Sequence, residues 1–327
     1  MNIQIKKSGI GVKGKKGTQS YFWYSVKQNK FAYFMILPAI ISMLIIHFLP
    51  MIQGIYISFI NLNMANMRKF LKAPFIGLKN YYDLFFGGLN SGFGDALINT
   101  FIYTVSVTFF TLALGICLAM LLNREFKLQG IARTVLLMPW VIPSYVVGIV
   151  WEKLWRKEGL INAVLSWLHI IGPDKADWPF WLVGPLTLVA IIIPTIWRGL
   201  PMSMILMLAG LQSVSPDYYE AAEIDGANGW QKFWSITLPL LKPILSINIM
   251  FSLINNIYSY NIVSMMFGNG AGQPGKWGDL LMTNIQRNSF QLWQFGQGAA
   301  ALVICMLFML VIVGFWYLIF KDDLVVK

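Results

Sequence analysis

The 327-residue chain is strongly apolar, with 57% hydrophobic and 12% charged residues and a mean hydropathy of +0.62. Soluble domains carry about 25% charged residues, so this composition excludes an ordinary soluble fold and indicates a membrane protein. The net charge of +11 does not indicate a nucleic-acid partner, because seven lysines fall within the first thirty residues, with no acid among them. Such a tail is typical of a cytoplasmic flank beside membrane lipid.

Six stretches reach the length of about 20 mainly apolar residues that a transmembrane helix needs. They cover residues 31–59, 97–122, 135–151, 180–211, 244–267 and 298–320. We therefore predict an all-α membrane protein with six transmembrane helices. An even number of spans places both termini on one side, and the basic tail assigns that side to the cytoplasm. No small-residue cleavage site follows the first span, so we expect this span to be a retained transmembrane helix and not a cleaved signal peptide.

The spans divide the chain into segments. Residues 1–30 form a basic cytoplasmic tail, 31–59 the first helix, 60–96 an extracytoplasmic segment, 97–320 a core with five helices, and 321–327 a second cytoplasmic tail. Within the core, residues 212–242 form a cytoplasmic loop. Cys117 and Cys305 both lie in apolar runs without C-x-x-C spacing, so neither a disulfide framework nor a zinc site is indicated.

The cytoplasmic loop begins with a clear helix start. Ser215 is a good N-cap, Pro216 suits the first helical position, and Asp217 faces the positive end of the helix dipole. We predict one helix to about Ile224, a bend at Gly226, and a second short helix over residues 228–237 before the next span. The alternative is that the loop is an amphipathic helical bend that lies at the membrane interface and binds no partner protein.

The spacing in this loop carries a resemblance. Glu220-Ala221-Ala222, three residues, Gly226, nine residues and Ile236-x-Leu238-Pro239 match the E-A-A-x3-G-x9-I-x-L-P motif at all seven specified positions. The chain thus resembles the permease subunits of binding-protein-dependent ABC importers. The runs IDGA (224–227), TLPLLKP (237–243) and FIGLKNYYDLF (75–85) are further similar to the carbohydrate-uptake branch, of maltose-permease MalF type.

The resemblance implies partners and a mode of action. The chain would move a carbohydrate, in particular an oligosaccharide, into a bacterial cell through the plasma membrane, without being an enzyme or holding a cofactor itself. Its partners would be a second dissimilar permease, an extracytoplasmic sugar-binding lipoprotein, and two copies of a cytoplasmic ATPase that hydrolyses ATP with Mg²⁺. The ATPase would grip the loop residues Glu220, Ala221, Ala222, Asp225 and Gly226, and residues 212–242 are therefore named the coupling loop.

Polar residues in two spans are candidates for the substrate pathway. Ser252, Asn256 and Ser259 recur on one helical face, with Asn255 beside them, and they serve either a pathway or hydrogen bonds between helices. The resemblance favours the pathway, with the register taken from Asn269-Gly270. It also implies sugar contacts in the preceding span, namely Thr195, Arg198, Gly199 and Met202. We expect Gly199 and Pro201 to interrupt that helix and open space between spans.

Rival functions predict residues that the sequence lacks. An ion-coupled secondary transporter would need Asp or Glu within the spans, and the six stretches contain none. A membrane enzyme would need a catalytic cluster, yet the only histidines, His47 and His169, stand alone, and GIGVKGKKGT departs from a P-loop at Lys16. Arg198 leaves the substrate's charge open. It would pair with an acidic, uronate-containing oligosaccharide, or bind the hydroxyls of a neutral one or a carbonyl freed by Pro201; we favour the neutral sugar.

Overall fold

The computed structural model describes residues 28–87, 92–268 and 273–322, and the chain divides into two units, Met1–Tyr56 and Ile57–Lys327. Most of the basic tail and the pair Asn269-Gly270 that sets the pathway register lie outside the described residues. In the described part, extended pairing is limited to an isolated bridge between Ile60 and Phe75. The expected all-α membrane fold is confirmed.

The first unit contains one long apolar helix. It comprises α2 (Lys30–Met43), the π-helical turn η1 (Leu44–Phe48) and α3 (Leu49–Ile57), which together make a candidate span of 28 residues. Pro50 follows the π-turn and has no N–H to donate to Ile46, so a wider turn at this point is expected.

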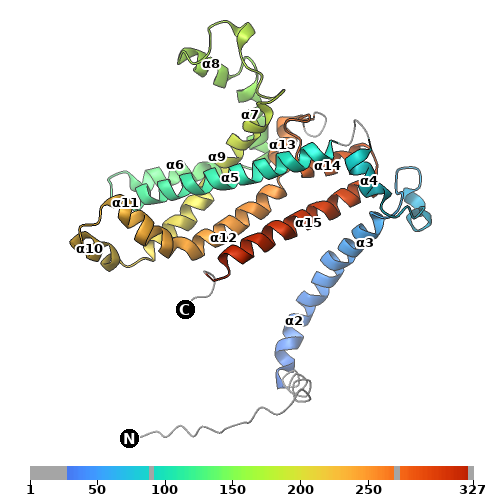
Figure 1. The fold of residues 1–327 in the computed structure, drawn as a ribbon, viewed down its shortest axis with the longest axis horizontal. Coiled ribbons are helices and arrows are strands. Elements are labelled where there is room, and N and C mark those ends of the chain that lie inside the picture. The colour runs from blue at the N-terminus through green and yellow to red at the C-terminus, as the bar shows by residue number, and fades with distance from the viewer. Residues whose placement is uncertain (1–27, 88–91, 269–272, 323–327) are drawn as a thin grey trace. The chain divides into compact units, whose positions relative to one another are not determined.

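The second unit holds the other helices. In chain order they are η2 (Met67–Lys72), α4 (Lys79–Phe86), α5 (Phe93–Leu122), α6 (Gln129–Val141), α7 (Ser144–Trp155), α8 (Leu160–Trp167), η3 (Lys175–Asp177), α9 (Thr187–Gln212), α10 (Pro216–Ile224), α11 (Gly229–Lys232), η4 (Phe233–Thr237), α12 (Leu238–Ile257), α13 (Asn261–Met266), α14 (Leu281–Gln286), η5 (Arg287–Gln291) and α15 (Phe295–Phe320). Figure 1 shows α5, α9, α12 and α15 as long neighbouring helices, with α10 and α11 at one end and α4 and α14 at the other.

Five helices among the described residues are long and apolar enough to cross a membrane, and a sixth span results if α6 and α7 are taken together. This agrees with six spans, but two of them are not continuous helices. Residues 135–151 are divided between α6 and α7, which meet at 95°. Pro143 disfavours helix at Ile142, whose ψ is 126°, and so accounts for this break. Residues 244–267 are divided between α12 and α13.

The predicted interruption at Gly199 and Pro201 is wrong, because α9 continues from Thr187 to Gln212 through both residues and through Pro194. Proline removes one backbone donor, and transmembrane helices tolerate this loss where neighbouring helices satisfy the freed group. The second helix of the coupling loop also differs from expectation. It does not stop before Pro239, since α11, η4 and α12 form one continuous stretch, Gly229–Ile257.

The helices α5 and α9 form the centre of the second unit. A Cβ at Gly115 would lie 2.5 Å from the Ser203 Oγ, so only glycine allows the two helices to approach this closely. Toward the coupling-loop end, Met204, Met207 and Leu208 of α9 pack in one apolar core with Ala119 of α5 and Leu241 of α12. This arrangement places α9 and α12 against the same helix, α5, and their polar residues face one another.

Candidate functional site

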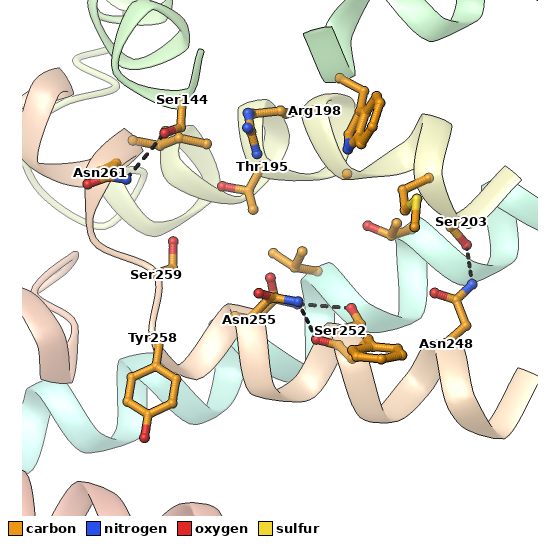
Figure 2. A pocket seen from close by; sticks show the side chains of 18 of the residues that line it. Ser144, Thr195, Arg198, Ser203, Asn248, Ser252, Asn255, Tyr258, Ser259 and Asn261 are labelled. Carbon is orange, nitrogen blue, oxygen red and sulfur yellow. Dashed lines mark hydrogen bonds between the residues drawn. The ribbon is translucent and has the colours of Figure 1, made fainter. Parts of the chain in front are cut away.

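A cavity of about 490 Å³ lies among α5, α6, α7, α9, α12 and α13. All eight pathway residues expected from the sequence line it, namely Thr195, Arg198, Gly199, Met202, Ser252, Asn255, Asn256 and Ser259. Figure 2 shows Thr195 and Arg198 on one side of the cavity and Asn255, Ser252 and Ser259 on the other. The volume is within the usual range of about 300–1,000 Å³ for small-molecule sites.

The structure adds polar residues that the sequence analysis did not select. Ser144, Ser203, Asn248 and Asn261 also line the cavity, as does Tyr260. Asn248 precedes Ser252 by four residues, so helical periodicity could have identified it. Ser144 and Asn261 each begin a helix directly after a break, and no sequence pattern indicated that these breaks adjoin the cavity.

Several lining residues also bond neighbouring helices. The Ser252 Oγ donates to the Thr108 Oγ1 at 3.1 Å, and the Asn256 Nδ2 donates to the same Thr108 oxygen at 3.2 Å. Asn256 is buried and also contacts the Ser252 Oγ at 3.1 Å, whereas Asn255 is exposed and donates to the carbonyl of Phe251. The structure thus shows hydrogen bonds between helices at Ser252 and Asn256, while the pathway interpretation of this face stays a prediction.

Arg198 is the only charged residue on the described lining of the cavity. Its Nε donates to the carbonyl of Ile142 at 3.3 Å, at the break between α6 and α7. The carbonyl that it meets is thus freed by the break before Pro143 and not, as one expectation had it, by Pro201. The remaining polar lining consists of amides and hydroxyls, so the cavity combines one guanidinium with many uncharged hydrogen-bonding groups.

The two helix breaks meet at the cavity. The Asn261 Nδ2, at the start of α13, donates to the Ser144 Oγ, at the start of α7, at 3.3 Å (Figure 2). Beyond this bond the two helices are in close contact, since a Cβ at Gly148 would lie 2.7 Å from the carbonyl oxygen of Ile262. The halves of the two spans that follow the breaks are therefore packed together as one element.

The coupling loop has the bend that its glycine suggested. Gly226 has φ +77°, its N–H donates to the Glu223 carbonyl at 3.0 Å, and the Ala227 N–H donates to the Ala222 carbonyl at 2.9 Å. These two bonds make a Schellman motif, in which a left-handed residue ends a helix. At the other end of α10, the Ser215 side chain caps the N–H of Asp217 at 3.3 Å, as expected.

The loop presents a large accessible surface. Glu220, Ala221 and Asp225 are exposed and Ala222 is half-buried, so of the two alanines Ala221 is the more open. Apolar side chains stand beside them, with Ile224 87% and Trp230 71% exposed. Exposed apolar groups rimmed by polar residues mark interaction sites, so the geometry suits docking by another protein.

An ion pair joins the two helices of the loop. The Lys232 Nζ lies 2.6 Å from the Glu223 Oε1, and this hydrogen bond and charge lower the pKa of the Glu223 carboxyl. Asn228 and Gln231 form a capping box that starts the second helix. The ion pair and the capping box therefore stabilise the two helices on either side of the bend. Among the described residues, no group of three His, Cys, Asp or Glu side chains could hold a metal ion.

Comparison with known proteins places these features in a family. Residues 111–325 match the family described as binding-protein-dependent transport system inner membrane component. The trehalose/maltose transport system permease protein MalF of Thermococcus litoralis is 32% identical over 280 residues, which cover 84% of this chain and 88% of that protein. The sulfoquinovosyl glycerol transport system permease protein SmoG of Agrobacterium fabrum is 31% identical over 283 residues, covering 86% and 87%.

A solved structure is similar over nearly the whole chain. It is a chain of a bacterial ABC transporter involved in the import of the acidic polysaccharide alginate, with a TM-score of 0.75 and 25% identity, and the match covers 92% of this chain and 99% of that one. A second structure of a bacterial alginate ABC transporter, in complex with an alginate pentasaccharide-bound periplasmic protein, matches with a TM-score of 0.71 and 26% identity, covering 92% and 98%.

Proposed function

The chain belongs to the family of binding-protein-dependent transport system inner membrane components, and we propose that its cavity is the sugar pathway of an importer that works by alternating access. It is a multi-pass permease of a sugar ABC importer. The observation that carries the proposal is the convergence of eight residues, chosen from two separate spans, on one cavity. Amides and hydroxyls there match the hydroxyl groups of a saccharide.

The coupling loop supports the second part of the proposal. We propose that two copies of a cytoplasmic ATPase, which bind ATP and Mg²⁺, work with a second permease, and that one copy grips Glu220, Ala221, Ala222 and Asp225 around the bend at Gly226. The exposed Ile224 and Trp230 extend the surface available to it. This arrangement requires both termini in the cytoplasm and a sugar-binding lipoprotein on the opposite side of the membrane.

The substrate that we propose is an uncharged oligosaccharide. One hydrogen-bonding group of Arg198 already serves the Ile142 carbonyl, and the other polar groups of the cavity are neutral. The substrates named for two relatives, trehalose/maltose and arabinooligosaccharides, are neutral sugars. The second belongs to the transport system permease protein AraP of Halalkalibacterium halodurans, 29% identical over 306 residues, covering 93% of this chain and 91% of that one.

An acidic oligosaccharide is the second candidate, and one observation favours it. Arg198 faces a cavity whose described lining contains no carboxylate, so the positive charge lacks an acidic partner there. Burying an unpaired charge is costly, and a carboxylate on the sugar would offset that cost. The alginate importer and the sulfoquinovosyl glycerol permease show that permeases similar to this chain are associated with acidic substrates.

Uptake by intact cells tests the proposal. A host strain lacking this gene, with and without a plasmid copy, is given labelled maltotriose, trehalose, arabinotriose and an alginate trisaccharide in turn. We expect plasmid-dependent uptake of at least one neutral sugar, abolished when the ATP supply is depleted. Uptake of the alginate trisaccharide alone would support the second candidate. If no member of this panel enters in a plasmid-dependent manner, the proposed pathway function is contradicted.

A further inference from the structure

Tyr103 of α5 is fully buried, yet its hydroxyl contacts two residues of the cavity wall. The ring packs in an apolar core with Val107, Ile191 and Val263. The phenol oxygen lies 3.0 Å from the Thr195 Oγ1 and 2.8 Å from the Ser259 Oγ. Tyr103 is not among the described residues that line the cavity, so it stands behind the wall that Thr195 and Ser259 form.

The hydrogen-bond directions follow from counting hydrogens. The Thr195 hydroxyl gives its one hydrogen to the Ile191 carbonyl at 2.9 Å, so toward Tyr103 it can only accept. Tyr103 is the donor toward both oxygens, so its single hydrogen is shared between the Thr195 Oγ1 and the Ser259 Oγ. The phenol of α5 thus joins Thr195 of α9 to Ser259 at the α12–α13 break through one atom.

Ser259 needs such support because it lies outside regular structure. It is the middle residue of the break between α12, which ends at Ile257, and α13, which begins at Asn261. Its N–H bonds the Asn256 carbonyl at 3.1 Å, but its backbone is not part of a helix, whereas the Tyr103 ring is packed in a buried apolar core. The fully buried Tyr103 ring holds its hydroxyl within hydrogen-bond distance of Ser259, so it is well suited to fixing the position of the break.

We propose that Tyr103 is a positioning residue of the pathway, whose hydroxyl holds Ser259 and the α12–α13 break in the geometry that faces the sugar. The inference rests on the proposed function of the cavity. Under this proposal Tyr103 does not contact the substrate, and its effect on transport depends on Ser259. Removal of the phenol oxygen should leave the ring packing intact and release the break from α9.

The test is Tyr103→Phe in the complete importer, expressed in the deletion strain. The probes are the two sugars of the panel above that the wild type takes up fastest, and the readouts are maximal uptake rate per inserted molecule and the ratio of the two rates. Tyr81→Phe is a matched control, because the Tyr81 hydroxyl also has a hydroxyl partner, the Ser58 Oγ at 2.7 Å, but this partner does not line the cavity as Thr195 and Ser259 do.

We expect Tyr103→Phe to change the rate ratio by about three- to tenfold, the equivalent of one hydrogen bond, and Tyr81→Phe to leave it unchanged. Ser259→Ala should have a similar effect, and the double variant should be no worse than the stronger single one, because both changes remove the same link. A general loss of stability would instead lower the amount of protein and both rates together.

Three outcomes would overturn the role of Tyr103: an unchanged rate ratio, additive effects in the double variant, or a loss explained entirely by protein amount. These are separable from failure of the proposed function. If the proposed function is wrong, the wild-type chain itself transports no sugar of the panel. If only the role of Tyr103 is wrong, the wild type and Tyr81→Phe both transport normally.

Discussion

Replacing Gly226 by valine tests the coupling loop at its bend. The residue has φ +77°, a region that β-branched residues strongly disfavour, and its N–H bonds the Glu223 carbonyl at 3.0 Å. A Cβ added there would have no atom within 4 Å, so the new side chain would meet no obstacle. The cost is therefore confined to the backbone, at about 1–2 kcal/mol or somewhat more for valine.

That cost is small relative to the stability of the whole protein and large relative to the stability of a local bend. A change of about 1–2 kcal/mol lowers the ratio of the bent to the unbent conformation by about 5- to 30-fold. The membrane spans lie outside the bend and keep their packing. We therefore expect Gly226→Val to insert at normal abundance and to reduce sugar uptake by about that factor, because the ATPase would rarely find the loop in its docking shape.

Gly226→Asn is the control, since asparagine tolerates the left-handed region and adds a side chain of similar size. Uptake of labelled sugar is measured in the deletion strain and divided by the amount of chain in the membrane. We expect the asparagine variant to retain most of its activity. Equal uptake by the valine variant and the wild type at equal abundance would refute the reasoning.

Three other substitutions probe the cavity and the helix contacts around it. Arg198→Gln keeps hydrogen-bond donors without the charge, so uptake of a neutral sugar should fall only a few-fold; near-complete loss, with recovery in Arg198→Lys, would indicate an acidic substrate. Gly148→Ala should cost about 1–3 kcal/mol by pushing α7 away from α13 and reduce the melting temperature of the purified chain, while Gly130→Ala, with open space around it, should not. Asn256→Ala should lower membrane abundance more than Ser252→Ala, because it removes two bonds from a buried amide; the reverse order would contradict the helix-joining role of Asn256.

Local signals explain what the sequence predicted well. The start of α10 at Pro216, its end at Ile224 and the left-handed Gly226 all agree with the structure, because caps and glycine bends act over a few residues. The lengths of the apolar runs likewise identified the spans. Pathway residues in α9 could be placed because this helix continues without a break toward the coupling loop.

Proline shows where local signals fail. Pro143 lies at a sharp break, whereas Pro194 and Pro201 lie within the continuous helix α9. The residue type is the same in each case, so the outcome depends on whether neighbouring helices hold the segment straight. The break around Ser259 contains neither proline nor glycine, and no pattern in the sequence indicated it. Tyr103 was missed for a related reason, since a tyrosine in an apolar run is normally read as core.

The positions of the breaks give an argument for the pathway that does not depend on family resemblance. Irregular backbone within a membrane is tolerated only where it is buried in protein or lines a cavity that holds water. Both breaks border the same cavity, through Ser144 on one side and Ser259 on the other. The Ile142 carbonyl freed at the first break accepts a hydrogen bond from Arg198, so two features that would each be costly in lipid offset one another. Packing alone does not account for the placement of both breaks and of Arg198, the one Lys or Arg within the six apolar stretches of the sequence, around the same space, and this coincidence supports the proposed pathway for a polar solute.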